Sequence, residues 1–325
     1  MTADNPTPLL TTRSLGRTPL FVSSVCVGTS ALGSFPAQYG YEVSSETAVA
    51  TIKRVFDGPF TFIDTSNEYG GGASERRIGR AIRENGGVPD GFLIATKVDP
   101  LPGSTDFSGD RVKKSIDESL ERLGLDTLPL VYLHDPEKIT FEQATAAGGP
   151  LEALIELKQQ GVIQHLGVAG GPIDVELQYL ATEVFDAVIS HNRFTLVEQT
   201  AEPLLDDAHR RGVAFINAAP FGGGMLVKGP DAVPTYCYAP VSDGTLARVR
   251  EMERLCLAAG VPLAAAALQF SLRDERVTST IVGMSEPGRV DQTVALAGIE
   301  IPDELWSELL PLAHVGRAGI EAFAG

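Results

Sequence analysis

The sequence predicts an α/β protein folded as a (β/α)8 barrel, the TIM-barrel arrangement. Short apolar runs alternate with segments of helical periodicity and give eight strand–helix units along the chain. Runs that are apolar at every position are typical of strands buried on both faces. Strands that alternate with helices favour a parallel sheet, and eight of them favour its closure. A length of 325 residues suits one such barrel, so we predict a single domain over residues 1–325.

The predicted strands are short apolar runs that end at glycine or at a polar residue. They lie at residues 24–27, 61–63, 92–96, 128–133, 163–168, 187–189, 213–216 and 277–282. The predicted helices have apolar residues three or four apart, at residues 46–56, 74–83, 110–123, 150–160, 173–181, 201–210, 246–258, 263–272 and 290–296. We expect Ser74 to cap the second of these helices and Gly124 to end the third.

Three segments fall outside the alternation. Residues 12–22 have the pattern of a hairpin with a glycine turn, which either covers the bottom of the barrel or is a disordered arm. Residues 222–243 contain glycine and proline without periodicity and are expected to form a long loop over the active face. Trp306 and Leu309–Leu310 predict a C-terminal helical extension that packs on the barrel wall.

The charge and the cysteines limit the function classes. The net charge of −16 argues against partners that are nucleic acids or anionic membranes, because both repel an acidic surface. The longest apolar runs are shorter than 18 residues, so no membrane-spanning helix is predicted. The three separated cysteines, and a start without the pattern of a secretory signal, lead us to expect a cytoplasmic protein. The oligomeric state cannot be predicted.

Four polar residues stand where predicted strands end. Asp64, Lys97 and His134 directly follow apolar runs, and Tyr69 comes five residues after Asp64. Enzymes built on parallel barrels place their chemistry at the carboxyl ends of the strands. We therefore expect an acid, a phenol, an ammonium and an imidazole to meet in one pocket.

This set suits proton transfer coupled to hydride transfer. A phenol has an ordinary pKa of about 10, and a nearby ammonium lowers it. We expect Lys97 to lower the pKa of Tyr69, Asp64 to anchor Lys97, and His134 to position the substrate oxygen. Tyr69 is then the general acid for carbonyl reduction or the general base for alcohol oxidation.

Each of the four residues also has an ordinary structural explanation. Asp64 suits a cap or turn, Tyr69 loop packing, Lys97 a solvated strand end, and His134 a turn beside proline. Their joint occurrence on successive strand ends favours catalysis. A non-catalytic barrel that binds nucleotide is the alternative, although it has no need of Lys97 beside Tyr69. Scattered histidines and the lack of Cys-x-x-Cys spacing predict no metal site.

Several motifs resemble the aldo-keto reductase family. They are DTSNEYG at 64–70, SERRIG at 74–79, ATKV at 95–98, LGLD at 123–126, LHD at 133–135, NRFTL at 192–196 and the segment 281–289. The similarity extends over roughly residues 10 to 300, and within the family the chain looks like the aldose 1-dehydrogenases, such as L-fucose, D-threo-aldose and pyridoxal dehydrogenases. The resemblance implies a barrel without metal, with NAD(P) across its mouth and with the four roles given above.

The resemblance also implies which residues contact the cofactor. These are Gly28, Asp64, Ala169, Gly170, His191, Asn192, Pro220, Phe221, Gly222, Gly224, Leu226, Gly283, Met284, Ser285, Arg289, Gln292 and Thr293. The chain departs from the family pattern at Ala169–Gly170, where Ser-Asn is common, and at Ala218, where an aromatic residue often stacks on the nicotinamide. Gly283 cannot pair with the 2′-phosphate of NADP, and Glu286 would repel it, which favours NAD or dual use.

The implied reaction interconverts an aldose hemiacetal or a small aldehyde or ketone with its oxidised or reduced form. Aromatic residues are expected to line the substrate pocket. The candidates are Phe35, Tyr39 and Tyr41, Phe221, and Tyr236 or Tyr238.

Overall fold

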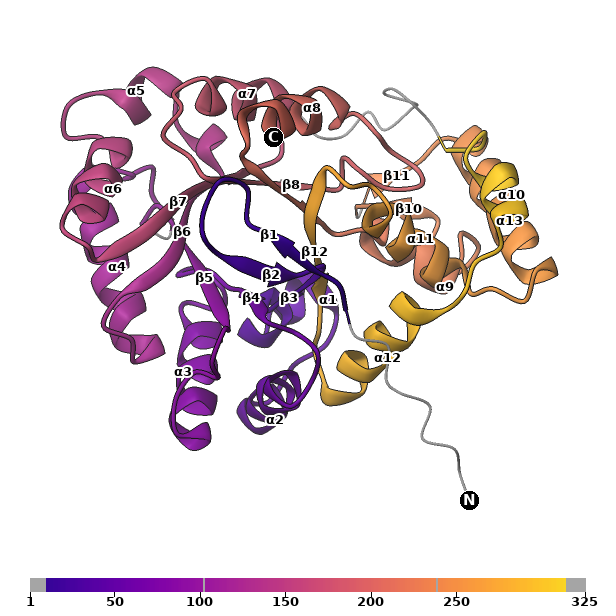
Figure 1. The fold of residues 1–325 in the computed structure, drawn as a ribbon, viewed down its shortest axis with the longest axis horizontal. Helices are drawn as coiled ribbons and strands as arrows, with labels where there is room; N and C mark the ends of the chain where they lie inside the picture. The colour runs from indigo at the N-terminus through magenta and orange to yellow at the C-terminus, as the bar shows by residue number, and fades with distance from the viewer. Residues whose placement is uncertain (1–9, 102, 238, 314–325) are drawn as a thin grey trace.

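The computed structural model describes residues 10–101, 103–237 and 239–313. Eight parallel strands form a closed barrel (Figure 1), as predicted. They are β3 (Val25–Gly28), β4 (Phe62–Asp64), β5 (Leu93–Val98), β6 (Leu128–His134), β7 (Ile163–Gly170), β8 (Ala187–His191), β9 (Ala214–Ala218) and β12 (Val277–Gly283). Strand β12 closes the cylinder by pairing with β9 on one side and β3 on the other.

Helices follow the strands and cover the outside of the barrel. The longer ones are α2 (Ser45–Phe56), α3 (Ala73–Asn85), α4 (Gly109–Leu123), α6 (Pro150–Gln159), α7 (Ile173–Leu180), α8 (Glu202–Arg211), α10 (Asp243–Ala258), α11 (Leu263–Leu272) and α12 (Pro287–Gly298). Short helical turns are η1 (Ser30–Gly33), α1 (Pro36–Tyr39), η2 (Pro136–Lys138), α5 (Phe141–Thr145), η3 (Gly222–Gly224) and α9 (Met225–Lys228).

Helix ends follow local chemistry. Ser44, Ser108 and Ser242 cap their helices with side chains that accept a backbone N–H bond. Gly124 ends α4 in the left-handed conformation, as expected. The expected cap at Ser74 is wrong. Gly72 precedes α3, and the buried Ser74 hydroxyl instead donates to the backbone of Thr29, which ties α3 to the end of β3.

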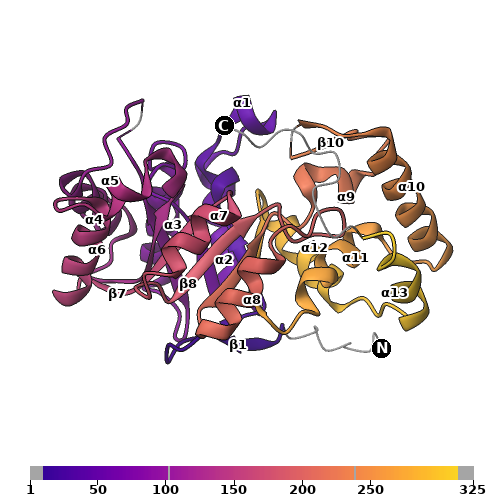
Figure 2. The same cartoon turned by 90° about the horizontal axis from the view of Figure 1, so that it is seen from above.

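The N-terminal hairpin covers the amino ends of the barrel strands. It pairs β1 (Thr12–Ser14) with β2 (Phe21–Ser23), and its Leu15 and Val22 are buried inside the barrel. The Arg13 guanidinium donates to backbone carbonyls near the start of β12, including that of Val277. Figure 2 shows β1 at the opposite side from α1 and β10, so the hairpin leaves the carboxyl ends of the strands open.

The segment predicted as one long loop is more regular than expected. It contains η3, α9 and a small hairpin of β10 (Thr235–Tyr236) and β11 (Ala239–Pro240). Buried Met225, Leu226 and Tyr236 anchor it, which explains why it is ordered without helical or strand periodicity. The predicted C-terminal extension is α13 (Asp303–Leu309), where Trp306 and Leu309 are buried but Leu310 is 42% exposed.

The barrel interior positions the site because side chains alternate along each strand. Apolar residues fill the lower interior, among them Phe62 of β4, Ala95 of β5 and Tyr132 of β6. Two residues further along the same strands stand the polar side chains of the predicted site. An L side chain at Gly167 would collide with the Tyr132 ring, with only 2.3 Å from its Cβ, so the bulky floor residue requires glycine on β7.

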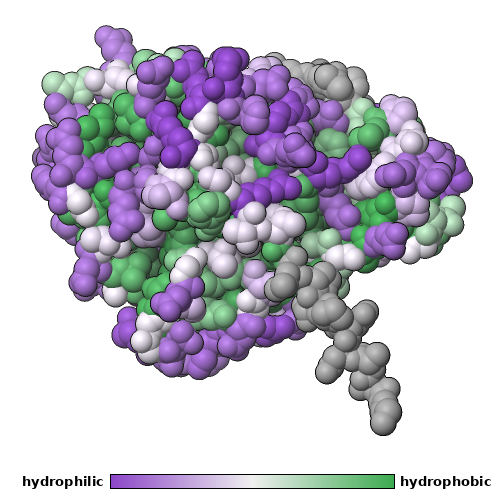
Figure 3. All heavy atoms as spheres, viewed as in Figure 1, coloured by the Kyte–Doolittle hydropathy of each residue, from purple (hydrophilic) through white to green (hydrophobic). Residues whose placement is uncertain are grey.

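The outer surface carries both hydrophilic and apolar residues (Figure 3). The face shown in Figure 3 carries many hydrophilic side chains around its edge, with apolar residues between them. Among the described residues, no single helix is long and apolar enough to cross a membrane. Helices α10 and α11 pass that test only as a pair, bent by 101°.

Candidate active site

Lys97 joins two of the predicted residues at the carboxyl ends of β4 and β5. Its ammonium donates three hydrogen bonds: to Asp64 Oδ1 at 2.5 Å, to the Thr65 carbonyl at 2.8 Å and to Tyr69 Oη at 3.2 Å. An ammonium has three donors and no acceptor, so all its protons are used. The Tyr69 hydroxyl therefore accepts from Lys97, and its own proton is available to the pocket.

The charges of this group differ from the expectation in one respect. Burial lowers the pKa of Lys97, but Asp64 and Tyr69 outweigh it, and the net pKa is raised, so Lys97 is charged. Burial raises the pKa of Tyr69, and Lys97 opposes this shift without reversing it. Lys97 lowers the pKa of Tyr69 by less than desolvation of the phenolate raises it. The expectation of a net pKa below the ordinary value is therefore wrong for this structure. Tyr69 is a protonated phenol at neutral pH.

His134 lies beside this group, on the neighbouring strand β6. Its ring stands edge-on to the Tyr69 ring, with 6.0 Å between centroids. Its Nδ1 lies 2.5 Å from Oδ1 of Asp99, a fully buried carboxylate two residues beyond Lys97. Its Nε2 lies 3.6 Å from Oδ1 of Asp135, which lines the pocket. The structure thus brings Asp64, Tyr69, Lys97 and His134 together.

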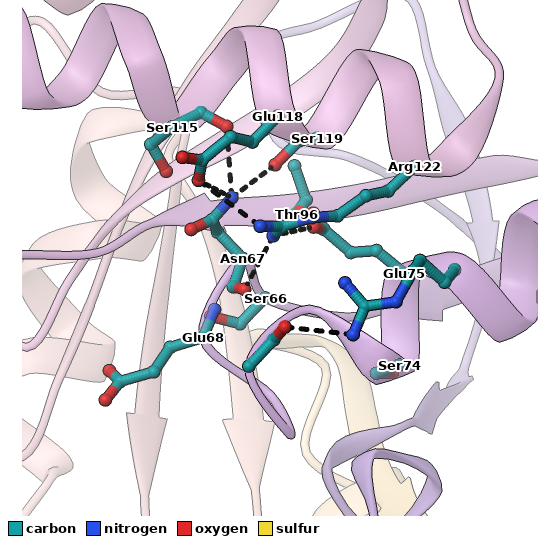
Figure 4. A network of polar contacts seen from close by, with 12 residues as sticks. Ser66, Asn67, Glu68, Ser74, Glu75, Thr96, Ser115, Glu118, Ser119 and Arg122 are labelled. Carbon is teal, nitrogen blue, oxygen red and sulfur yellow. Dashed lines mark hydrogen bonds and ion pairs between the residues drawn. The ribbon is translucent and has the colours of Figure 1, made fainter. Parts of the chain in front are cut away.

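The loop that carries Tyr69 is held from behind by polar contacts. The Asn67 amide donates to the Ser115 carbonyl at 3.1 Å and to Glu118 Oε2 at 3.2 Å, and Figure 4 shows it beside these residues of α4. Arg122 donates to the Asn67 carbonyl at 3.0 Å and to Glu75 Oε2 at 3.1 Å. Because these groups come from α3 and α4, the two helices fix the backbone just before Tyr69.

Gly70 fixes the backbone just after Tyr69. Its φ of +65° lies in the left-handed region, and a Cβ there would lie 2.0 Å from the Gly33 carbonyl oxygen. The loop therefore packs directly on η1, an approach that only glycine allows.

A pocket of about 850 Å³ opens beside these residues. Most of the predicted cofactor residues line it: Gly28, Asp64, Ala169, Gly170, His191, Asn192, Phe221, Gly224, Gly283, Ser285, Arg289, Gln292 and Thr293. Pro220, Gly222, Leu226 and Met284 do not line it. The Leu226 and Met284 side chains are fully buried in the core, and Gly222 packs against Tyr236, so these residues shape the loops from beneath.

The pocket suits a nicotinamide dinucleotide. Asp64 Oδ2 is buried without a hydrogen-bond partner among the described residues, so it can accept from a ligand hydroxyl or amide. A Cβ at Gly224 or Gly283 would extend into open space, which leaves the backbone accessible to a ligand. Ser285 and Arg289, which follow Gly283 in the chain, add a hydroxyl and a guanidinium to the pocket wall. Within the described ranges, no group of three or more His, Cys, Asp or Glu side chains is arranged to hold a metal ion.

Aromatic residues also line the pocket. Phe35, Tyr39, Tyr41 and Phe221 all contribute to it. Tyr236 does not, because it is fully buried and its hydroxyl donates to the Asn192 carbonyl. Tyr238 lies outside the described residues.

Some residues of the site were missed. Asp99 follows Lys97 by two positions on the same strand end, so the alternation that places Lys97 in the barrel places Asp99 on the same side. Asp135 follows His134 directly and is held in the left-handed region at φ 45°. Glu68, Lys228 and Cys237 also line the pocket, and the sequence carries no comparable signal for them.

A closed parallel barrel with this lysine-bound tyrosine beside a glycine-lined pocket has the features of a nicotinamide-dependent oxidoreductase. The model of the aldo/keto reductase family matches residues 24–312, and the chain belongs to this family. It is therefore an NAD(P)-dependent oxidoreductase.

Characterised relatives are similar over most of their length. The chain is 34% identical to an L-galactose dehydrogenase of Arabidopsis thaliana, over 87% of this chain and 86% of the relative. It is 30% identical to a pyridoxal 4-dehydrogenase of Microbacterium luteolum (91% and 96%) and 30% identical to a D-threo-aldose 1-dehydrogenase of a Pseudomonas species (82% and 88%). These relatives agree with the branch of the family that the motifs resemble.

The fold also matches a solved structure. An aldo-keto reductase from Bacillus halodurans, determined in its holo form, superposes with a TM-score of 0.77 at 22% identity, covering 96% of this chain and 99% of that one. This similarity supports the barrel fold.

Proposed function

We propose that the protein is a dehydrogenase that oxidises the C1 hydroxyl of an aldose hemiacetal, and that it also reduces small aldehydes. The observation that carries this proposal is the Lys97–Tyr69 contact of 3.2 Å at the wall of the large pocket. The names of the relatives, two of which are sugar dehydrogenases, support an aldose as the substrate.

In this proposal Tyr69 exchanges a proton with the substrate oxygen. Its raised pKa keeps the phenol protonated, which suits a general acid in carbonyl reduction. Lys97 stabilises the phenolate that forms when the proton leaves, and Asp64 holds Lys97 in place through the 2.5 Å contact. His134 holds the substrate oxygen from the other side.

The pocket supports binding of NAD(P) by its glycine backbones, by Asp64, and by the loop that carries Ser285 and Arg289. The nicotinamide would supply or accept the hydride at its C4 atom. We propose a preference for NAD, because Glu286 lies 4.0 Å from Arg289 and would repel a 2′-phosphate there.

The part of the pocket nearest His134 suits a polyhydroxylated ligand. Glu68 and Asp135 place carboxylates on its wall, and Tyr39 and Tyr41 contribute aromatic rings to the same pocket. Carboxylates accept hydrogen bonds from hydroxyl groups, and aromatic faces pack on the C–H face of a sugar ring.

The remaining proposals concern the whole chain. We propose that it acts as one domain, and that its acidic charge of −16 excludes nucleic acids and anionic membranes as partners. The three cysteines are free and buried, which supports a cytoplasmic location.

Absorbance of the reduced cofactor tests the function. Purified protein is mixed with NAD or NADP and a panel of aldoses, including L-galactose and L-fucose, and with NADH or NADPH and small aldehydes. We expect turnover of at least one aldose. Cofactor binding without any turnover would instead favour the alternative of a non-catalytic barrel that binds nucleotide.

A further inference from the structure

Asp99 is a buried carboxylate that the mechanism above does not use. Its side chain is 1% exposed, and Oδ1 lies 2.5 Å from His134 Nδ1. Its Oδ2 accepts from the Ser66 hydroxyl and from the Glu68 backbone N–H at 3.2 Å. Because Ser66 and Glu68 belong to the loop of Tyr69, Asp99 connects that loop to the histidine.

The contact determines where His134 carries its proton. An ionised carboxylate only accepts hydrogen bonds, so the Nδ1 atom 2.5 Å away must be protonated. In a neutral imidazole the other nitrogen, Nε2, is then an acceptor without a proton. Nε2 donates a hydrogen bond only when the ring is charged.

We propose that Asp99 is a positioning residue that fixes the proton of His134 on Nδ1, so that Nε2 holds a carbonyl oxygen only while the ring is charged. A carbonyl oxygen has lone pairs but no proton, and therefore needs a donor. A substrate hydroxyl can donate to a neutral Nε2. The Tyr69 phenol supplies one donor to a carbonyl oxygen, and the charge of His134 then determines whether Nε2 supplies a second. The effect on carbonyl reduction rests on the proposed function, whereas the position of the proton on His134 does not.

Several charged or titratable groups face the His134 ring. They are Asp64, Tyr69, Lys97, Asp99, Asp135, Glu137 and His191. Burial lowers the pKa of His134, but Asp99 and Asp135 outweigh both burial and Lys97, and the pKa is raised above its ordinary value. The charged ring thus persists to a higher pH than in an ordinary histidine.

The direct test is a ¹⁵N NMR titration of the histidine rings in the wild-type protein, without cofactor. We expect His134 to show a protonated Nδ1 and an unprotonated Nε2 once the ring has become neutral. A neutral ring protonated on Nε2 would overturn the proposal, and this measurement requires no activity.

Asp99→Asn supplies the second test. Removing a carboxylate at this distance should move the His134 ionisation down by about one to three pH units. For the reduction of glyceraldehyde by NADH, kcat/KM should decline as the pH rises, and the midpoint of this decline should move down by the same amount. If the asparagine amide reverses the tautomer of His134, the decline should instead disappear. A His134 titration and a pH profile that both stay at the wild-type position would contradict the proposal.

Asp186→Asn is the matched control. Asp186 also contacts a histidine nitrogen, His165 Nδ1 at 3.2 Å, but it precedes β8 at the other end of the barrel. The Asp186→Asn variant should therefore have the wild-type pH profile of reduction. If wild-type protein turns over none of the aldoses and none of the carbonyl compounds, the proposed function fails while the titration of His134 still decides the inference.

Discussion

The Lys97 ammonium donates a 3.2 Å hydrogen bond to the Tyr69 hydroxyl, and its other two protons are held by Asp64 and the Thr65 carbonyl. The lysine therefore has one orientation and a permanent charge. Burial nevertheless keeps the Tyr69 pKa above its ordinary value. Lys97 thus limits the cost of forming a phenolate, and the resting state is the phenol.

Lys97→Met should abolish measurable turnover and destabilise the fold. Asp64 would remain as a buried charge without its partner, a situation that costs about 3–5 kcal/mol. Chemical denaturation at pH 7 measures the free energy of unfolding. The double variant Asp64→Asn/Lys97→Met should regain part of that stability but no activity. If Lys97→Met were as stable as wild type, the buried pair would not be a charged one.

Gly70→Ala should lower kcat by displacing Tyr69. The new Cβ would lie 2.0 Å from the Gly33 carbonyl oxygen, so the loop must move. Gly71→Ala is the control, because its φ of +59° gives similar backbone strain while its Cβ meets nothing within 4 Å. Gly70→Ala should lose more stability than Gly71→Ala, because it adds the collision to the backbone strain, and only Gly70→Ala should lose substantial activity. Equal kcat values would show that the contact with η1 does not position Tyr69.

Gly283→Arg should shift cofactor preference towards NADP. A Cβ at Gly283 extends into open space at the pocket wall, so a guanidinium can be placed there without collision. It would partly offset Glu286 and pair with a 2′-phosphate. The measurement is the ratio of kcat/KM for NADP and NAD, with Gly283→Ala as a neutral control. An unchanged ratio in the arginine variant would place the adenosine ribose elsewhere.

Stability should fall in acid because of Asp99. Burial raises the pKa of Asp99, but His134 and Ser66 outweigh it and lower the pKa from 3.8 to about 2. A carboxyl group with a lowered folded-state pKa stabilises the fold fully above pH 3.8, and this contribution is lost as the pH falls through 2. At about 1.4 kcal/mol per unit, roughly 2 kcal/mol is involved.

Thermal unfolding between pH 5 and 2.5 measures this effect. The stability difference between wild type and Asp99→Asn should shrink towards low pH. The exposed Asp117→Asn variant should instead follow wild type at every pH. If the stability difference between wild type and Asp99→Asn stays constant with pH, the Asp99–His134 pair is not ionised.

Much of the fold could be predicted because the barrel strands are uniformly apolar. The run before His134, for example, is buried at nearly every position, and together with the alternating helices such a run favours a strand of a parallel sheet that is covered on both faces. The segment 222–243 was harder, because Met225 and Tyr236 fold it through burial against distant elements. Such tertiary contacts leave no local period in the sequence.

The site was predicted to a similar degree. Asp64, Lys97 and His134 each continue an inward-facing row, and this alternation brings all three to the wall of one pocket. Asp99 obeys the same alternation as Lys97, but it is followed by Pro100, a pattern that is equally typical of a turn. The direction of the Tyr69 pKa shift depends on how deeply the ring is buried, which no sequence pattern states.

The most direct test of the central claim is the rate of hydride transfer in Tyr69→Phe, measured in a single turnover with saturating cofactor. We expect the rate to fall by about 10²–10⁴-fold, while cofactor affinity, followed by fluorescence titration, stays near the wild-type value. Tyr39→Phe, which removes another pocket hydroxyl, should retain most of the rate. A Tyr69→Phe rate equal to that of wild type would show that Tyr69 does not carry the proton.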